Sequence, residues 1–214
     1  MNEQAYSSYA RVVHPLKIKI MKTITLVGLL LLTYVSGFGQ DVPSSDIQMK
    51  TALLAAPTEL KDGAKIYGYN GAGEFITLRE GTNGLICLSD DPNSKGFNVA
   101  CYQKDLDPFM ARGRELKKEG KTSQEIFDIR ETETKAGKIN IPKGSTLYVY
   151  NAEDGDVTWA SGEVVNGYLR YVVYVPFETS ESTGLPTKPE FAGQPWIMNP
   201  GTHRAHIMLS PPRE

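Results

Sequence analysis

Residues 84–102 read GLICLSDDPNSKGFNVACY, and this stretch decides the architecture expected of the chain. Apolar runs at residues 84–88 and 97–102 flank residues 89–96, which are rich in Asp, Pro, Asn, Ser and Gly. Because these residue types favour turns, the pattern predicts two antiparallel strands joined by a loop. Cys87 and Cys101 are equally far from the centre of that loop, so they would face each other across the hairpin.

A disulfide between Cys87 and Cys101 is the interpretation that this placement favours. Opposed residues in antiparallel strands have Cα atoms about 4.5–5.5 Å apart, which lies within the range of disulfides. The alternative is a pair of buried free thiols that pack as small hydrophobic side chains. A nucleophilic cysteine would need a histidine beside its thiolate, and no local motif marks either cysteine for that chemistry.

Helices and a further hairpin are expected on both sides of this one. Residues 64–69 and 74–79 flank Asn70-Gly71-Ala72-Gly73, an order typical of a strand–turn–strand unit. Capping residues, prolines and glycines indicate where helices begin and end. The expected helices run from Ser44 or Ser45 to Pro57, from Asp107-Pro108 to Gly120, and from Thr122 or Ser123 to Gly137.

The C-terminal third is expected to add strands to the same sheet. Residues 145–150 form one, and residues 168–176 are so continuously apolar or aromatic that they suit a central strand covered on both faces. Residues 178–195 read as a loop, and residues 196–198 and 205–209 as a closing hairpin. We therefore predict an α+β fold, a mainly antiparallel sheet built from hairpins with two or three inserted helices.

The N-terminal 39 residues have the pattern of an export signal. Lys22 precedes an apolar run at residues 24–35, and Gly37 and Gly39 supply the small residues of a cleavage site. A permanent membrane span is the weaker interpretation, since it needs about 20 apolar residues. We expect cleavage after Gly39, a single globular domain at residues 40–214, and a periplasmic or secreted protein. Residues 1–20 either extend the signal or precede a true start at Met21.

Composition excludes several classes of function. The chain is 40% hydrophobic and 22% charged with a net charge of −2, which excludes a disordered chain and gives no basic surplus for nucleic acid. Gly71-Ala72-Gly73 lacks the Lys-Ser/Thr of a phosphate-binding loop, and no cofactor is expected. Asp90-Asp91-Pro92 lacks the alternating acidic residues of a calcium loop and reads as a turn.

Several motifs resemble an uncharacterised family of exported bacterial proteins of unknown function. They are residues 80–92, Ala100-Cys101-Tyr102, residues 108–113, residues 181–186 and Ala205-His206-Ile207-Met208. The resemblance implies export and a single domain, and it transfers no catalytic residue to this chain.

His203 and His206 are the weak candidates for a metal or catalytic site. On a strand, residues three apart point to opposite faces, so the favoured interpretation is a pair of ordinary surface or turn histidines. The alternative is a small hydrolase or metal-dependent enzyme, with Asp90, Asp91 or Glu80 as a further ligand if the fold brings it close. No catalytic or binding residue is assigned on this basis.

Tyrosines recur on the expected strands and suggest a binding surface. Exposed tyrosines on a sheet could bind a glycan, a peptide or a protein, whereas half-buried ones would only cover the sheet. We expect a non-catalytic binding or interaction module, with the loop at residues 178–195 beside Trp196 as the place to look for a ligand. The tyrosines concerned are Tyr67, Tyr69, Tyr148, Tyr150, Tyr168, Tyr171 and Tyr174.

Overall fold

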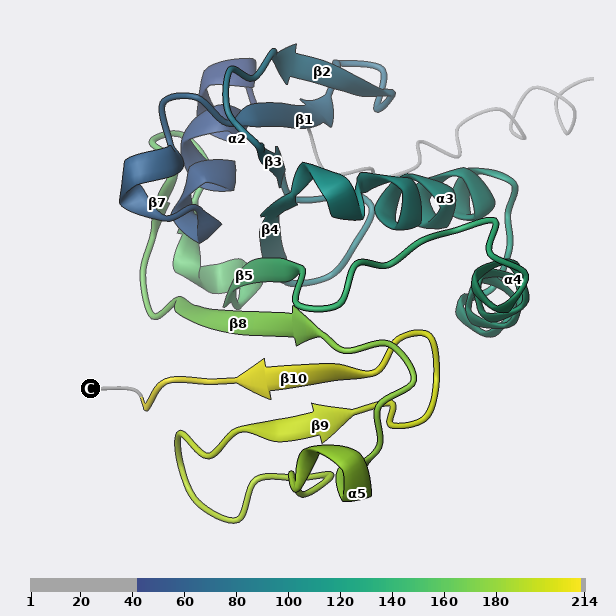
Figure 1. Ribbon diagram of the computed structural model, residues 1–214. Helices are drawn as coiled ribbons and strands as arrows, with labels where there is room; N and C mark the ends of the chain where they lie inside the picture. Colours follow the sequence, from purple (N-terminus) through teal and green to yellow (C-terminus); the bar gives the residue numbers. More distant parts are fainter. Residues whose placement is uncertain (1–41, 213–214) are drawn as a thin grey trace, which may run out of the picture. The chain divides into compact units, whose positions relative to one another are not determined.

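Eight strands form one sheet in the order β2-β1-β3-β4-β5-β8-β10-β9 (Figure 1). The structure is a computed structural model that describes residues 42–212, so the expected signal peptide and its cleavage site lie outside the described residues. The strands are β1 (Lys65–Tyr69), β2 (Phe75–Arg79), β3 (Leu85–Leu88), β4 (Phe97–Gln103), β5 (Thr146–Ala152), β8 (Tyr168–Tyr174), β9 (Trp196–Met198) and β10 (His206–Leu209). A separate small sheet pairs β6 (Val157–Thr158) with β7 (Glu163–Val164).

The sheet is antiparallel except where β1 pairs with β3. The helices of the described residues are α2 (Ser45–Ala52), α3 (Asp107–Lys118), α4 (Ser123–Lys135) and α5 (Ser180–Thr183), with a 3₁₀ turn η1 (Leu53–Ala55) after α2. The predicted α+β class with a mainly antiparallel sheet is confirmed. Within residues 42–212, no helix is both long enough and apolar enough to cross a membrane.

The hairpin of β3 and β4 has the predicted register. Cys87 pairs with Cys101 across the two strands, and their sulfur atoms form a disulfide with the Cα atoms 4.0 Å apart. Both cysteines are fully buried at the centre of the sheet. The predicted pairing of the two cysteines is therefore confirmed, and an oxidised pair is compatible with an exported protein.

Capping side chains set the starts of two helices where the sequence predicts them. The Ser44 hydroxyl accepts a hydrogen bond from the Ile47 amide at the start of α2. At the start of α4, Thr122 and Glu125 each bond the other's backbone N–H and form a capping box. These contacts satisfy amide groups that have no partner within the helix.

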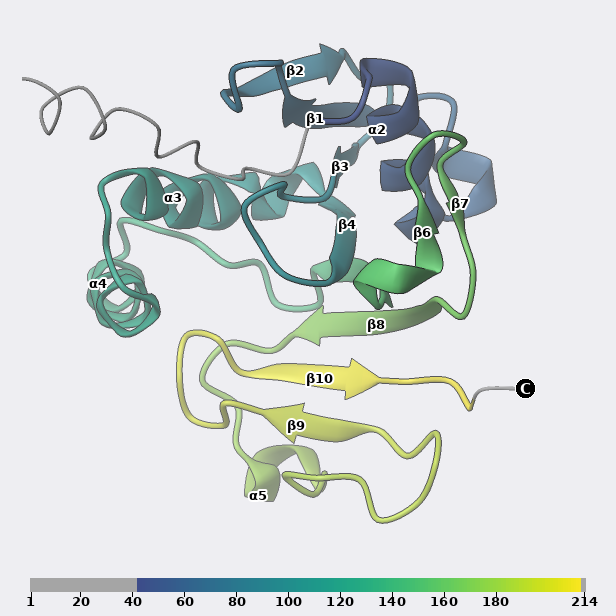
Figure 2. The same cartoon turned by 180° about the vertical axis from the view of Figure 1, so that it is seen from behind.

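The two faces of the sheet carry separate hydrophobic cores. One core packs α2 and η1 against the face that contains the cystine, with Ala52 and Val99 fully buried. The other packs α3 and residues 139–141 against the opposite face, with Phe109 and Val172 at its centre. Figures 1 and 2 show α2 and α3 on opposite sides of β3 and β4 in both views. The sheet is thus the middle layer between two groups of helices.

Some expectations need correction. Strand β8 lies between β5 and β10 as predicted, but Tyr171 is 37% exposed, so the strand is not covered on both faces. The segment at residues 178–195 is not all loop, because Thr179 and Ser182 cap the short helix α5 and Gly184 ends it with a φ of 70°. The parallel pair of β1 and β3 was not predicted, since no tight turn joins the two strands. The β6–β7 hairpin was not predicted either, although Ser161-Gly162 lies in its turn and Gly162 has a φ of 66°.

Candidate functional site

The two candidate histidines are buried, which corrects the expectation that they lie on the surface, although His203 does lie in a turn as predicted. His203 lies in the turn between β9 and β10 and is 0% exposed, and His206 at the start of β10 is 6% exposed. The turn folds against α4, and the rings of Phe109 and Phe127 lie 5.7 and 4.8 Å from the His203 ring. Apolar rings on two helices therefore enclose a side chain that the sequence places on a turn.

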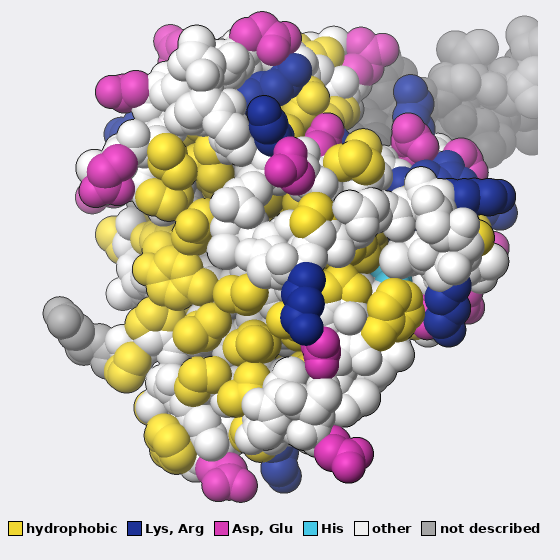
Figure 3. All heavy atoms as spheres, viewed as in Figure 1, with side chains coloured by type: hydrophobic (Ala, Val, Ile, Leu, Met, Phe, Trp, Pro, Cys, Tyr) yellow, Lys and Arg dark blue, Asp and Glu magenta, His cyan; other side chains and the backbone are white. Residues whose placement is uncertain are grey.

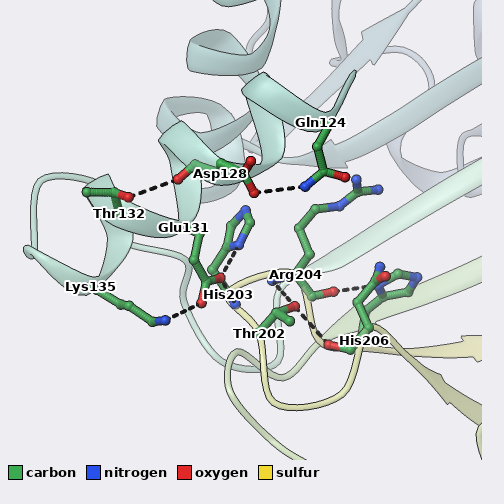
Figure 4. Close-up of polar contacts among 10 residues, drawn as sticks. Gln124, Asp128, Glu131, Thr132, Lys135, Thr202, His203, Arg204 and His206 are labelled. Carbon is green, nitrogen blue, oxygen red and sulfur yellow. Dashed lines mark hydrogen bonds and ion pairs between the residues drawn. The ribbon is translucent and has the colours of Figure 1, made fainter. Parts of the chain in front are cut away.

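Glu131 of α4 is the partner of His203 (Figure 4). Its Oε2 atom lies 2.6 Å from His203 Nδ1 and also accepts a hydrogen bond of 2.8 Å from the His203 backbone N–H. Lys135 forms an ion pair of 2.6 Å with the other carboxylate oxygen. The carboxylate thus joins two segments that are 72 residues apart in the chain.

The environment shifts the pKa of both members of this pair. Burial works to raise the pKa of Glu131, but hydrogen bonds from Lys135 and His203 outweigh it and lower the value to about 2. Burial lowers the pKa of His203, and the nearby cations Arg130 and Arg204 lower it further, against the opposing hydrogen bond to Glu131. At neutral pH the site therefore holds an ionised carboxylate and a neutral imidazole.

His206 engages different groups. Its Nδ1 atom lies 2.7 Å from the Arg204 carbonyl oxygen, and its ring lies 5.7 Å from that of Tyr174. Burial lowers the pKa of His206. Figure 4 shows the His203 ring directed to α4 and the His206 ring lying on the other side of Arg204. The hydrolase or metal-enzyme interpretation would require this region to open, since His203 is 0% exposed and His206 only 6% exposed.

The carboxylates considered as further ligands are held elsewhere. Asp90 Oδ1 accepts a hydrogen bond from the Asn98 backbone amide of β4, Asp91 pairs with Lys117, and Glu80 pairs with Lys65. In the part of the chain that the structure describes, no three His, Cys, Asp or Glu side chains gather as a metal-binding group. Glu131 was not predicted from the sequence to be a partner of His203, although its spacing of four residues from Phe127 places both on one face of a helix.

An aromatic and cationic cluster at the other end of the sheet was also missed. Arg114 donates hydrogen bonds of 3.0 Å to the Tyr102 hydroxyl and to Asp107. Its guanidinium lies 5.5 Å from the centre of the Tyr67 ring and 5.3 Å from that of Phe75. Arg114 lies on α3, where Asp107 pairs with it, and it contacts one ring on β1 and one on β2, so the cluster ties the helix to these two strands. The Phe75 side chain remains 38% exposed.

The tyrosines do lie on strands, and the register divides them between the two faces of the sheet. Tyr148 and Tyr171 lie opposite one another on β5 and β8, with ring centres 5.8 Å apart. Tyr174 is buried whereas Tyr171 is 37% exposed, so the tyrosines of the sheet do not form one uniformly exposed row. Figure 3 shows hydrophobic side chains gathered in a broad band over β8, β10 and β9.

An open groove of about 480 Å³ lies beside the start of β8. No described residue that lines it is charged; the lining consists of residues 166–169, Tyr171, Pro211 and Pro212. Asn166 adopts a left-handed backbone conformation with a φ of 52° and donates a side-chain hydrogen bond to Asp156. The lining that the structure describes thus presents aromatic, proline and amide groups and carries no charged side chain, which suits an uncharged ligand.

The loop expected to carry a ligand site packs partly against the sheet. The Ile197 amide donates to the Pro186 carbonyl oxygen, and Leu185 packs on the small core around Ile197. Trp196 packs against the core on the α3 side. Phe191, at 65% exposure, is the most exposed large hydrophobic side chain of the described residues. The loop therefore packs against the sheet at Leu185 and Pro186 and is exposed to solvent at Phe191.

In comparisons with known proteins, no protein-family model, curated protein or solved structure matches the chain.

Proposed function

We propose that the protein is an exported, non-catalytic binding module and that the groove beside β8 is its ligand site. The observation that carries the proposal is the groove of about 480 Å³, whose described lining has no charged side chain and includes Tyr171, which is 37% exposed. Volumes of about 300–1,000 Å³ are typical of ligand sites. The ligand is an uncharged glycan or peptide segment, because aromatic and proline surfaces bind such groups without charge pairing.

The features that favour export also support the proposal of a binding module. The disulfide is compatible with folding in an oxidising compartment, and the apolar run at residues 24–35 has the pattern of a signal peptide. Cleavage after Gly39 would release residues 40–214 to the periplasm or the medium. A binding module there meets free or envelope-attached glycans and peptides.

A binding assay on panels of neutral oligosaccharides and uncharged peptides tests the ligand site. Saturation-transfer NMR on the purified protein identifies a binder, and calorimetry then compares variants. Tyr171→Ala is expected to weaken binding by at least about tenfold, as aromatic anchors of binding sites do. Phe75→Ala is the matched control, because Phe75 is 38% exposed but lies on β2, at the other end of the sheet. Equal losses in the two variants, or no binder in either panel, would count against the proposal.

A further inference from the structure

The contact between α4 and the β9–β10 turn depends on one carboxylate oxygen. Glu131 Oε2 accepts two hydrogen bonds from His203, one from the imidazole Nδ1 at 2.6 Å and one from the backbone N–H at 2.8 Å. His203 is 0% exposed, and the Glu131 side chain is 17% exposed. Phe127 of α4 also packs against the His203 ring, so this pair adds two polar contacts to an aromatic one between α4 and the turn.

The tautomer of His203 follows from the chemistry of its partner. An ionised carboxylate can only accept hydrogen bonds, so the proton of the neutral imidazole must sit on Nδ1. The Nε2 atom then carries only a lone pair. It is buried and has no hydrogen-bond partner among the described residues. The closed arrangement therefore satisfies Nδ1 and leaves Nε2 buried without a hydrogen bond among the described residues.

A second proton would have to be placed on that Nε2 atom. In the closed arrangement this second proton would create a buried N–H donor without an acceptor, and leaving that donor unpaired costs free energy. Phe109 of α3 and Phe127 of α4 wall the ring, and Arg130 of α4 and Arg204 of the turn add unfavourable positive charge. Glu131 acts in favour of the proton, but Lys135 already shares the charge of its carboxylate.

We infer that Glu131 and His203 form an acid-released latch, which holds α4 against the β9–β10 turn at neutral pH and lets them separate on mild acidification. When the turn lifts away, Nε2 reaches water and the imidazole takes up a proton at its ordinary pKa of about 6.5. Acid therefore favours the open arrangement, because only that arrangement accommodates the imidazolium. The β3–β4 hairpin is held by its disulfide and should not take part.

Hydrogen exchange of the full chain at pH 7.5 and 5.5, corrected for the intrinsic dependence of exchange on pH, tests the latch. The population of the open form is expected to rise by up to about tenfold between these pH values, since one proton is taken up on opening. The faster exchange should appear in the amides of α4 and residues 199–205, while the β3–β4 amides keep their protection. Unchanged protection of α4 between the two pH values would overturn the inference.

Two variants separate the latch from general acid sensitivity. His203→Asn keeps an amide N–H near the Nδ1 position but has nothing to titrate, so its α4 exchange should no longer respond to pH, even if the smaller side chain loosens it at both values. His206→Asn should keep the response, because His206 bonds the Arg204 carbonyl rather than α4. A His203→Asn protein that retains the full response contradicts the latch.

A measurement on the unmodified protein covers the case in which a variant does not fold. The NMR shifts of the His203 ring should remain those of a neutral imidazole in the closed form at pH 5.5. A folded-state titration of His203 at or above pH 6.5 would contradict the inference.

Discussion

Cys87 lies directly opposite Cys101 in the register of β3 and β4, with the Cα atoms 4.0 Å apart and both side chains fully buried. The bond joins two inner strands of the eight-stranded sheet, at the layer where α2 and η1 pack. It closes the turn-rich loop between these strands and so restricts the unfolded chain.

Removing this bond should destabilise the protein substantially. The cysteines are 14 residues apart, and closing a loop of that size contributes about 3 kcal/mol in the chain-entropy model. The double variant Cys87→Ala/Cys101→Ala is expected to lower the free energy of unfolding by that amount, measured by urea denaturation. A reducing agent should destabilise the natural protein to a similar extent and leave the double variant unaffected.

The capping box of α4 makes a second prediction. Thr122→Ala removes the hydroxyl that accepts from the Glu125 amide and should cost about 1 kcal/mol of stability. Thr132→Ala is the control, because Thr132 is an exposed position within the same helix and its hydroxyl donates to the Asp128 carbonyl of that helix. Alanine there should be neutral or slightly stabilising. Equal costs at the two positions in thermal unfolding would argue against the cap.

Gln48 connects α2 to the sheet through its amide. The side chain accepts from the Tyr69 amide at 2.8 Å and donates to the carbonyl oxygens of Tyr69 and Pro43 at 2.8 and 2.7 Å. Gln48→Leu preserves the size of this buried side chain but leaves those groups unpaired, at an expected cost of about 1–3 kcal/mol. Ser45→Ala, at an exposed position of the same helix, should change the free energy of unfolding by less than about 0.5 kcal/mol.

Asp90 should make stability depend on pH. Burial raises the pKa of Asp90 to about 6, with Asp91 and Asp154 adding to the effect against the Asn98 hydrogen bond. A raised folded-state pKa means that the folded chain binds the proton more tightly, so this carboxyl stabilises the fold below about pH 4 and loses that contribution as pH rises through 6. Asp90→Asn should therefore be more stable than the natural protein at pH 8, by on the order of 2 kcal/mol.

The comparison for Asp90 is the difference between the two proteins across the pH range. That difference should shrink to nothing near pH 4, where both carry a neutral side chain. The buried histidines act in the opposite direction in both proteins and cancel in the difference. A constant difference from pH 4 to 8 would contradict the assignment.

The parts of the fold that could be predicted are those marked by residues close together in the sequence. The hairpins and helix ends depend on neighbouring residues, such as the turn at residues 89–96 and the cap at Thr122, and both were predicted in place. The parallel pairing of β1 with β3 depends on packing between segments without a tight turn, and the sequence carries no comparable signal for it. The capping residue Thr179 of α5 was not predicted, because the prolines and glycines around it are typical of a loop.

The candidate site was predictable only in part, for a related reason. His203 and Glu131 are 72 residues apart, and their meeting depends on how the β9–β10 turn packs on α4. A turn sequence predicts that its side chains are exposed to solvent. His203 is buried instead, because Phe109 of α3 and Phe127 of α4 pack against its ring. The groove beside β8 likewise needs Pro211 and Pro212 to lie next to Tyr171, which no local pattern indicates.

Intact-mass analysis of the protein recovered from the extracytoplasmic fraction tests the account of an exported, disulfide-closed domain most directly. The account predicts a chain that begins at Gln40 and is lighter by two hydrogens than its reduced form. A cytosolic chain that begins at Met1 or Met21 and carries both thiols would contradict it.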